Sequence, residues 1–343
     1  MKFDLIMTGG NPPPYQTPAA RFFASTIDLA VLAEELGYNG VWTAEHHFSD
    51  GYFSQQFPVL AAIAARTTTL RIGTYIVVLP LHHPIEVAEL SSTLDAISNG
   101  RFDLGLGQGY YLEEFSAFGI PHNQRPSRLQ EGLEIIRGLW EQDSFGYDGK
   151  RFQFDPVSLR PKPTVQKLPM WVAGIAPDAI DRAARFGCHL AGAGSPEVIA
   201  MYEESLSKYG YDPAQFYKGT LRMVHIADTR EQAWHNAHEH IFEILNTYNY
   251  KLKEAGIPVP PDGFFGIDPV PQAKDLANAK GLHFYGAPLI VGTPEDAIRE
   301  LERSAADAPV THQIMWMQIG GMDPRLTEHS MRLFAEKVAP HFN

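Results

Sequence analysis

The residues best suited to chemistry are a glutamate and two histidines, Glu45, His46 and His47, which follow directly on the apolar run 40–44. Histidine changes its charge near neutral pH and can move protons, and a neighbouring carboxylate can assist it. A buried strand that ends in titratable side chains is how an α/β enzyme places chemistry at the carboxyl end of its sheet. The sequence therefore predicts a proton-handling centre here. The alternative is that these are hydrogen-bonded polar residues at a strand end.

The same three residues bear on metal binding. His46 and His47 are neighbours in an extended segment, so their side chains point to opposite faces and cannot both bind one ion. No third ligand follows at metal-ligand spacing, and the single cysteine, Cys188, excludes a multi-cysteine zinc site. We expect no metal. We also expect only one of the two histidines to face the site.

Three further segments could contribute to a site. Glycines at 105, 107 and 109 surround a strand end and would let a planar or anionic ligand approach the backbone, although their spacing is not a dinucleotide fingerprint. The strand that ends near Gly174 leads into a helix that begins at Pro177, where free amides could hold a phosphate. Asp178 would oppose that charge, so a structural role is equally expected. The pair at 82–83 follows another strand end and fits a dimer contact as well as catalysis.

The composition of the chain excludes some classes of binding partner. A formal net charge of −12 argues against nucleic acid or an anionic membrane, and no apolar run approaches the roughly 20 residues that span a bilayer. The N-terminus is too short and too acidic for a secretory signal. We expect a cytoplasmic protein.

Strand-like and helix-like segments alternate along the chain. Apolar and β-branched runs predict eight strands, at residues 2–8, 39–44, 70–79, 101–106, 169–174, 188–193, 220–227 and 312–319. Amphipathic periodicity predicts the helices at 24–37, 57–68, 84–98, 124–141, 177–186, 195–208, 229–250, 294–306 and 324–338. Residues 144–168 are expected to form an inserted hairpin, and the Pro- and Gly-rich stretch 251–288 a surface excursion or lid. The pattern predicts a single (β/α)8 TIM barrel domain over residues 1–343, not a doubly wound sheet.

Several of these segments, in the same order along nearly the whole chain, resemble the bacterial luciferase-like flavin monooxygenases. The segments that carry the resemblance are Glu45-His46-His47-Phe48, Gly73-Thr74 with the apolar run to Leu79-Pro80, His83-Pro84, Ser98-Asn99-Gly100-Arg101-Phe102 and Val291-Gly292-Thr293-Pro294-Glu295. Their joint occurrence is specific to the superfamily but not to a substrate.

The resemblance implies roles for individual residues. His46 matches the histidine that acts as acid and base and stabilises the flavin C4a-peroxide. Tyr75 and Ile76 match a non-proline cis peptide under the isoalloxazine ring. Other residues that the resemblance assigns to binding of flavin mononucleotide (FMN) are Glu45, then Gly109, Tyr110 and Tyr111 at the ring edge, and Gln108, Ala173, Gly174 and Ile175 toward the phosphate.

The chain departs from the family pattern near the phosphate. Gly107 stands where luciferase has a reactive cysteine, and Gln108 replaces a phosphate-binding arginine. Gly174, Ile175 and Asp178 replace a glutamate, a serine and a threonine. Light emission is therefore not implied, and the phosphate contacts would come from backbone amides with Arg125 or Arg128.

The activity that the resemblance implies is that of a two-component monooxygenase. A separate flavin reductase would supply reduced FMN, and O2 would form a C4a-peroxide that hydroxylates a small apolar substrate or oxidises it by Baeyer–Villiger insertion. The family commonly forms dimers, so a homodimer is expected. One alternative is hydride transfer with the deazaflavin F420 on the same barrel, although the Glu-His-His-Phe order favours the oxygenase. Another is a flavin-binding protein without turnover.

Overall fold

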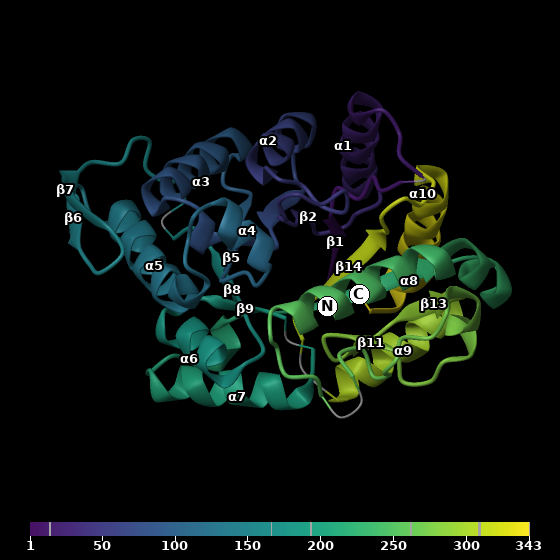
Figure 1. The fold of residues 1–343 in the computed structure, drawn as a ribbon. Helices are drawn as coiled ribbons and strands as arrows, with labels where there is room; N and C mark the ends of the chain where they lie inside the picture. Colours follow the sequence, from purple (N-terminus) through teal and green to yellow (C-terminus); the bar gives the residue numbers. More distant parts are fainter. Residues whose placement is uncertain (14, 166, 193, 261–262, 308–309, 343) are drawn as a thin grey trace.

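The computed structural model describes residues 1–13, 15–165, 167–192, 194–260, 263–307 and 310–342. Within these residues, eight parallel strands close into a barrel, which confirms the predicted (β/α)8 fold (Figure 1). In order around the barrel they are β1 (Lys2–Met7), β2 (Gly40–Thr43), β3 (Arg71–Thr74), β5 (Phe102–Gly107), β8 (Met170–Ala173), β9 (His189–Ala191), β10 (Lys218–Ile226) and β14 (His312–Gln318). The barrel closes between β14 and β1, where Lys2 pairs with His312.

Helices connect the strands and cover the outside of the barrel (Figure 1). They are α1 (Ala19–Glu35), α2 (Gln56–Arg66), α3 (Pro84–Ser98), α4 (Leu112–Ala117), α5 (Arg125–Glu141), α6 (Pro177–Arg185), α7 (Pro196–Lys208), α8 (Arg230–Glu254), α9 (Pro294–Asp307) and α10 (Pro324–Leu333). Local sequence explains where many of them begin. Proline occupies the first position of α3, α6 and α7, where its missing N–H costs no hydrogen bond. The Thr229 side chain caps α8 by accepting from the Gln232 amide.

Short 3₁₀ or π segments supplement these helices: η1 (Leu79–Leu81), η2 (His122–Gln124), η3 (Pro213–Gln215), η4 (Ala273–Asn278), η5 (Phe334–Val338) and η6 (Ala339–Phe342). The C-terminal helix predicted to reach residue 338 thus changes to a π-helix after Leu333.

The structure corrects the predicted third strand. The run 70–79 is not continuous, because β3 ends at Thr74 and the two-residue strand β4 (Val77–Val78) follows a cis peptide bond between Tyr75 and Ile76. The prediction also contained neither the short helix α4 nor strand β13 (Ile290–Gly292), which pairs with the carboxyl-terminal half of β10.

The two irregular regions of the sequence differ in character. Strands β6 (Phe145–Asp148) and β7 (Gln153–Val157) form the expected antiparallel hairpin within 144–168, of which residue 166 lies outside the described residues. The stretch 251–288, of which 261–262 lie outside the described residues, is more ordered than its composition suggested. It holds η4 and a small hairpin of β11 (His283–Phe284) and β12 (Ala287–Pro288).

This stretch is anchored by buried aromatic residues. Phe265 and Phe284 stack with parallel rings 5.7 Å apart, and Phe284 lies 5.8 Å from the ring of Trp316 in β14. Both phenylalanines are at most 1% exposed. The stretch therefore packs on the barrel and is not merely a surface excursion.

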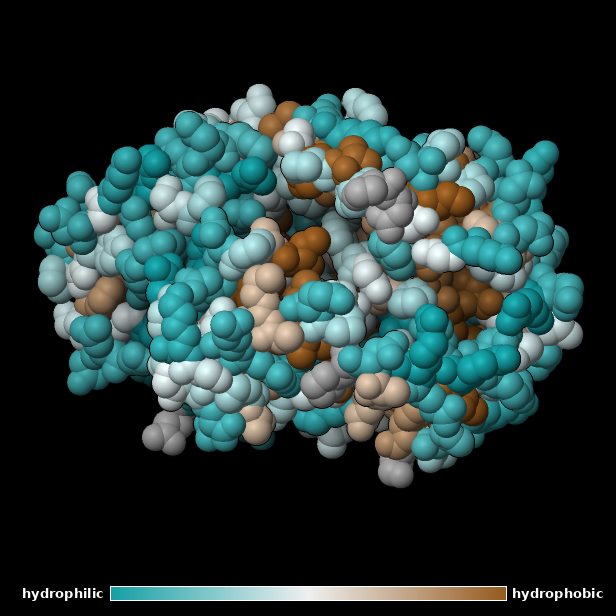
Figure 2. Space-filling view, turned by 90° about the horizontal axis from the view of Figure 1, so that it is seen from below, coloured by the Kyte–Doolittle hydropathy of each residue, from teal (hydrophilic) through white to brown (hydrophobic). Residues whose placement is uncertain are grey.

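The apolar core has two main parts. One part fills the layer between strands and surrounding helices, and the other fills the barrel interior together with the inner face of α8. In the interior, Trp42 packs edge-on against Trp171 with ring centroids 5.2 Å apart. Figure 2 shows a mostly hydrophilic face on which hydrophobic residues appear in small groups. Among the described residues, no helix combines the length and apolarity needed to cross a membrane.

Candidate active site

His46 lies just beyond the carboxyl end of β2, and a buried glutamate holds its ring. His46 Nδ1 is 2.9 Å from Oε1 of Glu114, at the start of α4, and the amide of His47 donates to the same oxygen at 2.8 Å. The side chain of Glu114 is completely buried and that of His46 is 10% exposed. Because a carboxylate only accepts hydrogen bonds, the contact places the proton of the neutral imidazole on Nδ1. Nε2 is thereby left as the atom that can take or give a proton.

Tyrosines enclose the His46 ring. Tyr111 stacks on it with centroids 4.0 Å apart, and Tyr52 meets it edge-on at 4.5 Å. Tyr110 lies 5.9 Å away, and the Tyr52 hydroxyl donates to that of Tyr248 at 2.6 Å. Burial raises the pKa of Tyr52, Tyr110 and Tyr248 well above the usual value, so these phenols stay neutral. Apart from the Glu114 carboxylate at Nδ1, the His46 ring thus lies among aromatic, uncharged side chains.

Glu45 turns to a different set of partners. Its Oε1 accepts from Nε2 of His47 at 3.0 Å and from Nε2 of His82 at 2.7 Å. Its Oε2 accepts from the Val78 amide at 3.2 Å and from Gln56 Nε2 at 3.3 Å. Burial alone would raise the pKa of Glu45, but the hydrogen bonds from His47 and His82 hold it at about 2. Both oxygens of this carboxylate therefore have protein partners.

The two histidines at 82 and 83 have different roles. His82 reaches Glu45, whereas His83 caps α3 by accepting from the Ile85 amide at 3.3 Å. The expectation that no third ligand accompanies the histidines of β2 rested on spacing along the chain. The fold brings Glu45, His47 and His82 together, with one possible donor atom from each within 4.8 Å of the others.

The Tyr75–Ile76 peptide bond is cis, as the family resemblance implied. The carbonyl of Ile76 accepts from Gln56 Nε2 at 3.0 Å. The neighbouring glycines of β5 serve this segment: a Cβ at Gly107 would lie 2.7 Å from Ile76 Cδ1, and one at Gly105 would collide with the Thr74 carbonyl. On that side, protein atoms and not a ligand require these glycines.

The residues assigned to the phosphate lie at the ends of β5 and β8. Ala173 ends β8, the Gly174 amide donates to the Ala191 carbonyl at 3.3 Å, and Ile175 is 50% exposed. Gln108 follows β5 directly and is partly exposed.

The two arginines expected to help bind the phosphate hold backbone carbonyls. Arg125 donates to the Gly109 carbonyl at 2.6 Å, and Arg128 donates to that of Pro80 at 2.8 Å. Arg128 also lies over the ring of Phe152. These contacts give both arginines a structural role.

The ring end of a flavin fits this region better than its phosphate end. The hydroxyls of Tyr75, Tyr110 and Tyr111 are buried and make no hydrogen bond of normal geometry among the described residues. Buried hydroxyls of this kind are normally paired, so a polar planar molecule beside them would satisfy them. Tyr75 is the first residue of the cis peptide, and Tyr110 and Tyr111 are two of the residues assigned to the ring edge.

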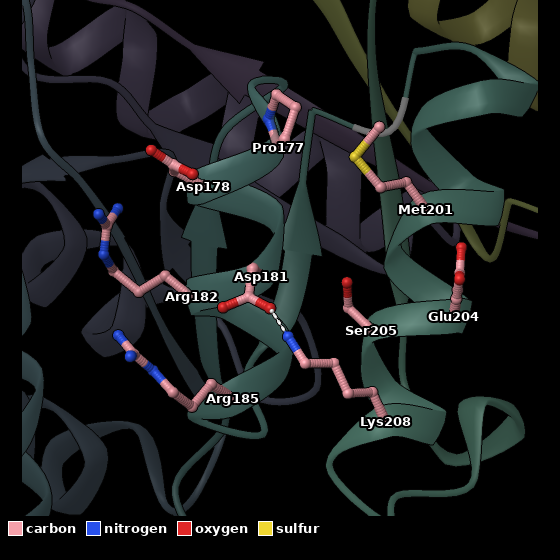
Figure 3. A pocket seen from close by; sticks show the side chains of 9 residues that line it. All are labelled: Pro177, Asp178, Asp181, Arg182, Arg185, Met201, Glu204, Ser205 and Lys208. Atoms are coloured by element: carbon pink, nitrogen blue, oxygen red, sulfur yellow. Dashed lines mark hydrogen bonds and ion pairs between the residues drawn. The ribbon is translucent and has the colours of Figure 1, made fainter.

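A groove of about 750 Å³ lies elsewhere, between α6 and α7 (Figure 3). Acidic and basic side chains line it together, and Lys208 pairs with Asp181 across it at 2.9 Å. None of the residues assigned to the cofactor or to catalysis is among those that line it. Its mixed charges do not suit an apolar substrate.

Sequence reasoning missed Glu114, although a signal existed. Glu113 and Glu114 lie in the segment that follows β5, two and three residues beyond Tyr111. In a barrel, the loops after neighbouring strands meet at one face, so an acid after β5 can reach a histidine after β2.

The barrel, with a histidine and carboxylate at the carboxyl ends of its strands, is the architecture of a (β/α)8 enzyme that transfers protons at its mouth. The sequence model of the luciferase-like monooxygenases matches residues 1–312, and the chain belongs to this family.

Named relatives agree with this assignment. The chain is 29% identical over 262 residues to the oxygenase component of the flavin-dependent trigonelline monooxygenase of Acinetobacter baylyi, covering 73% of this chain and 71% of that protein. It is 25% identical to the alkanal monooxygenase alpha chain of Photobacterium leiognathi over 99% of both chains. The crystal structure of the monooxygenase RslO1 from Streptomyces bottropensis superposes over 100% of both chains with a TM-score of 0.84 and 26% identity. The protein is an enzyme, a flavin-dependent monooxygenase.

Proposed function

We propose that this protein is the oxygenase component of a two-component system. It takes reduced FMN from a separate reductase and uses O2 to hydroxylate a small apolar organic substrate or to oxidise it by Baeyer–Villiger insertion. One observation carries the proposal: His46, held at Nδ1 by the buried Glu114, lies within an uncharged tyrosine wall at the carboxyl end of the barrel. A second component is supported by the trigonelline relative, which is itself named as an oxygenase component.

The cofactor would lie beside the cis peptide. Tyr75 and Ile76 would contact its ring, with Gly109, Tyr110 and Tyr111 at the ring edge. Glu45 lies beside this segment, because its carboxylate accepts from the amide of Val78, two residues after Ile76. Gln108, Ala173, Gly174 and Ile175 would lie toward the phosphate. When bound, reduced FMN supplies the two electrons that activate O2.

The residues of this chain would manage the proton and exclude water. His46 Nε2 donates or accepts a proton at the reacting oxygen, while Glu114 fixes the orientation and tautomer of the ring. The neutral tyrosines give a medium of low polarity in which each hydrogen bond is stronger than in water. The stretch 251–288, anchored through Phe284 on Trp316, would act as the lid.

An apolar substrate is supported by exposed side chains in the loops beyond the carboxyl ends of the strands. Phe48 after β2, Phe118 after α4 and Ile175 after β8 are 62%, 43% and 50% exposed. Phe48 and Phe118 lie close to one another, with ring centroids 6.2 Å apart. Contiguous exposed apolar groups are typical of binding sites on soluble proteins, and Phe48 and Phe118 form such a contact.

The remaining features of the proposal follow from the family. We infer one catalytic domain over residues 1–343, a homodimer, and a cytoplasmic location where a flavin reductase is present. Each of these can be tested independently of the chemistry, by limited proteolysis, by sedimentation and by fractionation.

The deciding experiment compares cofactors and then follows oxygen. The protein is titrated under anaerobic conditions with reduced FMN and with reduced F420, and is then mixed with ¹⁸O2 and a panel of aldehydes, cyclic ketones and aromatic compounds. We expect reduced FMN to bind and one ¹⁸O atom to appear in the product. Tight binding of F420 without oxygen incorporation would overturn the proposal in favour of hydride transfer. Binding of FMN without product from any substrate, unchanged in His46→Ala, would favour a flavin-binding protein without turnover.

A further inference from the structure

We propose that Glu45, His47 and His82 bind one divalent transition-metal ion of the zinc class. This site is separate from the proton-transfer pair, because His46 and Glu114 contribute none of its donor atoms. The inference goes beyond the proposed function, since it needs no flavin, oxygen or substrate.

The distances suit a small ion. For a tetrahedral ion with bonds of about 2.0–2.1 Å, two ligand atoms are roughly 3.3 Å apart. Here Oε1 of Glu45 is 3.0 Å from Nε2 of His47 and 2.7 Å from Nε2 of His82. Each of these two contacts would lengthen by about 0.3–0.6 Å to admit the ion, and one donor atom from each of the three residues lies within 4.8 Å of the others.

The chemistry of the donors selects the class of metal. Two imidazoles and one carboxylate are ligands that Zn²⁺ and its neighbours Co²⁺ and Ni²⁺ accept, whereas Mg²⁺ and Ca²⁺ prefer oxygen ligands. Among the described residues, these three are the group of His, Cys, Asp and Glu side chains that converge closely enough for an ion. Their mutual contacts already bring one negative charge to two nitrogen donors.

The surroundings orient the carboxylate. Oε2 of Glu45 accepts from the Val78 amide and from Gln56 Nε2, which fixes the plane of the carboxylate and leaves Oε1 facing the two histidines. In protein metal sites, residues that do not touch the ion commonly make such hydrogen bonds to the ligand side chains and orient them. The site therefore has an ordered ligand as well as a suitable donor set.

One side of the cluster is open to solvent. The side chains of Glu45 and His47 are 3% and 6% exposed, whereas that of His82 is 19% exposed. An ion can thus enter past His82, and water can complete its coordination. Three protein ligands with one open position is a recognised zinc arrangement.

The test uses Co²⁺ as a spectroscopic probe on the full-length protein. The protein is treated with a chelator, freed of it and titrated with Co²⁺ while visible absorption is recorded; bound Zn²⁺ is then counted by mass spectrometry after dialysis. We expect one equivalent of Co²⁺ with the absorption of a four- or five-coordinate site, displaced by one equivalent of Zn²⁺. His82→Gln should weaken binding at least tenfold, whereas His83→Gln, its neighbour and cap of α3, should bind as the wild type does.

Two results would overturn the inference. One is the absence of stoichiometric Co²⁺ and Zn²⁺ binding to the folded wild type, which would leave the cluster as a hydrogen-bonded clasp. The other is binding that His82→Gln and Glu45→Gln leave unchanged. Circular dichroism of each variant without metal verifies that the fold is intact. Because no flavin is present, failure here leaves the proposed monooxygenase activity untouched.

Discussion

The carboxyl ends of the barrel strands, the mouth, and their amino ends, the floor, both bury titratable groups, but the histidines at the two ends have different kinds of partner. At the mouth, each histidine after β2 meets a carboxylate, His46 at Glu114 and His47 at Glu45. At the floor, His189 accepts from the Tyr217 amide and His312 lies against the Thr311 hydroxyl. The mouth thus contains histidine–carboxylate pairs, whereas the floor histidines have neutral partners.

The pKa values at the two ends show what this difference means. At the floor, burial lowers the pKa of His312 to about 3 and that of His189 to about 4, and it raises the pKa of Asp4 to about 7. The largest histidine shift, that of His312, and the largest aspartate shift, that of Asp4, therefore lie at the end of the barrel that holds structural residues. A shifted pKa by itself identifies burial; the position of the group and its partner identify a site.

The largest expected effect is from removing the mouth histidine. His46→Ala should lower turnover about 10³-fold while leaving binding of reduced FMN nearly unchanged, because general acid–base catalysis is lost. The matched floor variant, His312→Gln, should lower the unfolding midpoint but keep turnover per folded molecule within about twofold. Product formation and anaerobic flavin titration measure the two quantities. Equal loss of turnover in both variants would remove the distinction between the two ends.

The next effect concerns the positioning of His46. Glu114→Gln keeps the size of the side chain but removes the charge that holds Nδ1–H, so turnover should fall roughly 10–100-fold with little change in KM. The control is Glu113→Gln, since the Glu113 side chain is 60% exposed and pairs with Lys251 at the surface. Steady-state kinetics with saturating reduced FMN measures both. A rise in KM at constant kcat would show that Glu114 serves substrate binding and not the histidine.

The floor predicts a pH effect on stability. The folded pKa of Asp4 is raised, mainly by burial, from 3.8 to about 7. The stability associated with its neutral form is complete below pH 3.8 and is lost as pH rises through about 7. Asp4→Asn should therefore raise the free energy of unfolding by about 2 kcal/mol at pH 8 and by much less at pH 4. Urea unfolding at both pH values measures this, and an equal gain at both would contradict the assignment.

The sequence predicted the fold well where local chemistry decides it. Proline at the first position placed α3, α6 and α7 within a residue of their observed limits. Periodicity did not predict the break in the third strand, because residues 70–79 form an apolar, β-branched run that is typical of one continuous strand. The cis bond at Tyr75–Ile76 lies within that run. The cis bond itself was expected only from the family resemblance.

The site was only half predictable for a related reason. His46 can be recognised in the sequence because it follows a predicted strand, but its partner Glu114 is 68 residues away in sequence. Likewise, His82 is 37 residues from Glu45 in sequence. Strand periodicity places residues at the mouth of the barrel without determining which side chains meet there. Those pairings depend on the lengths of the loops and on the short helix α4, which the sequence did not reveal.

The smallest expected effect concerns the neutral groups of the mouth and tests whether two of its tyrosine hydroxyls stabilise the fold as a hydrogen-bonded pair. The Tyr52 hydroxyl donates to that of Tyr248 at 2.6 Å; Tyr248 is buried and Tyr52 is partly buried. Tyr248→Phe leaves the Tyr52 hydroxyl without its acceptor and should cost about 1–2 kcal/mol of stability. Tyr52→Phe should cost about 1 kcal/mol, since the Tyr248 oxygen loses only a donor.

The double variant distinguishes a pair from two independent hydroxyls. Replacing both partners removes the unsatisfied group that each single change creates, so its cost should be smaller than the sum of the single costs by about 1 kcal/mol. Urea unfolding of the wild type, the two single variants and the double variant measures the four free energies that this double-mutant cycle needs. If the costs simply add, the two hydroxyls act independently. The pairing that separates the mouth from the floor would then be limited to its histidines and carboxylates.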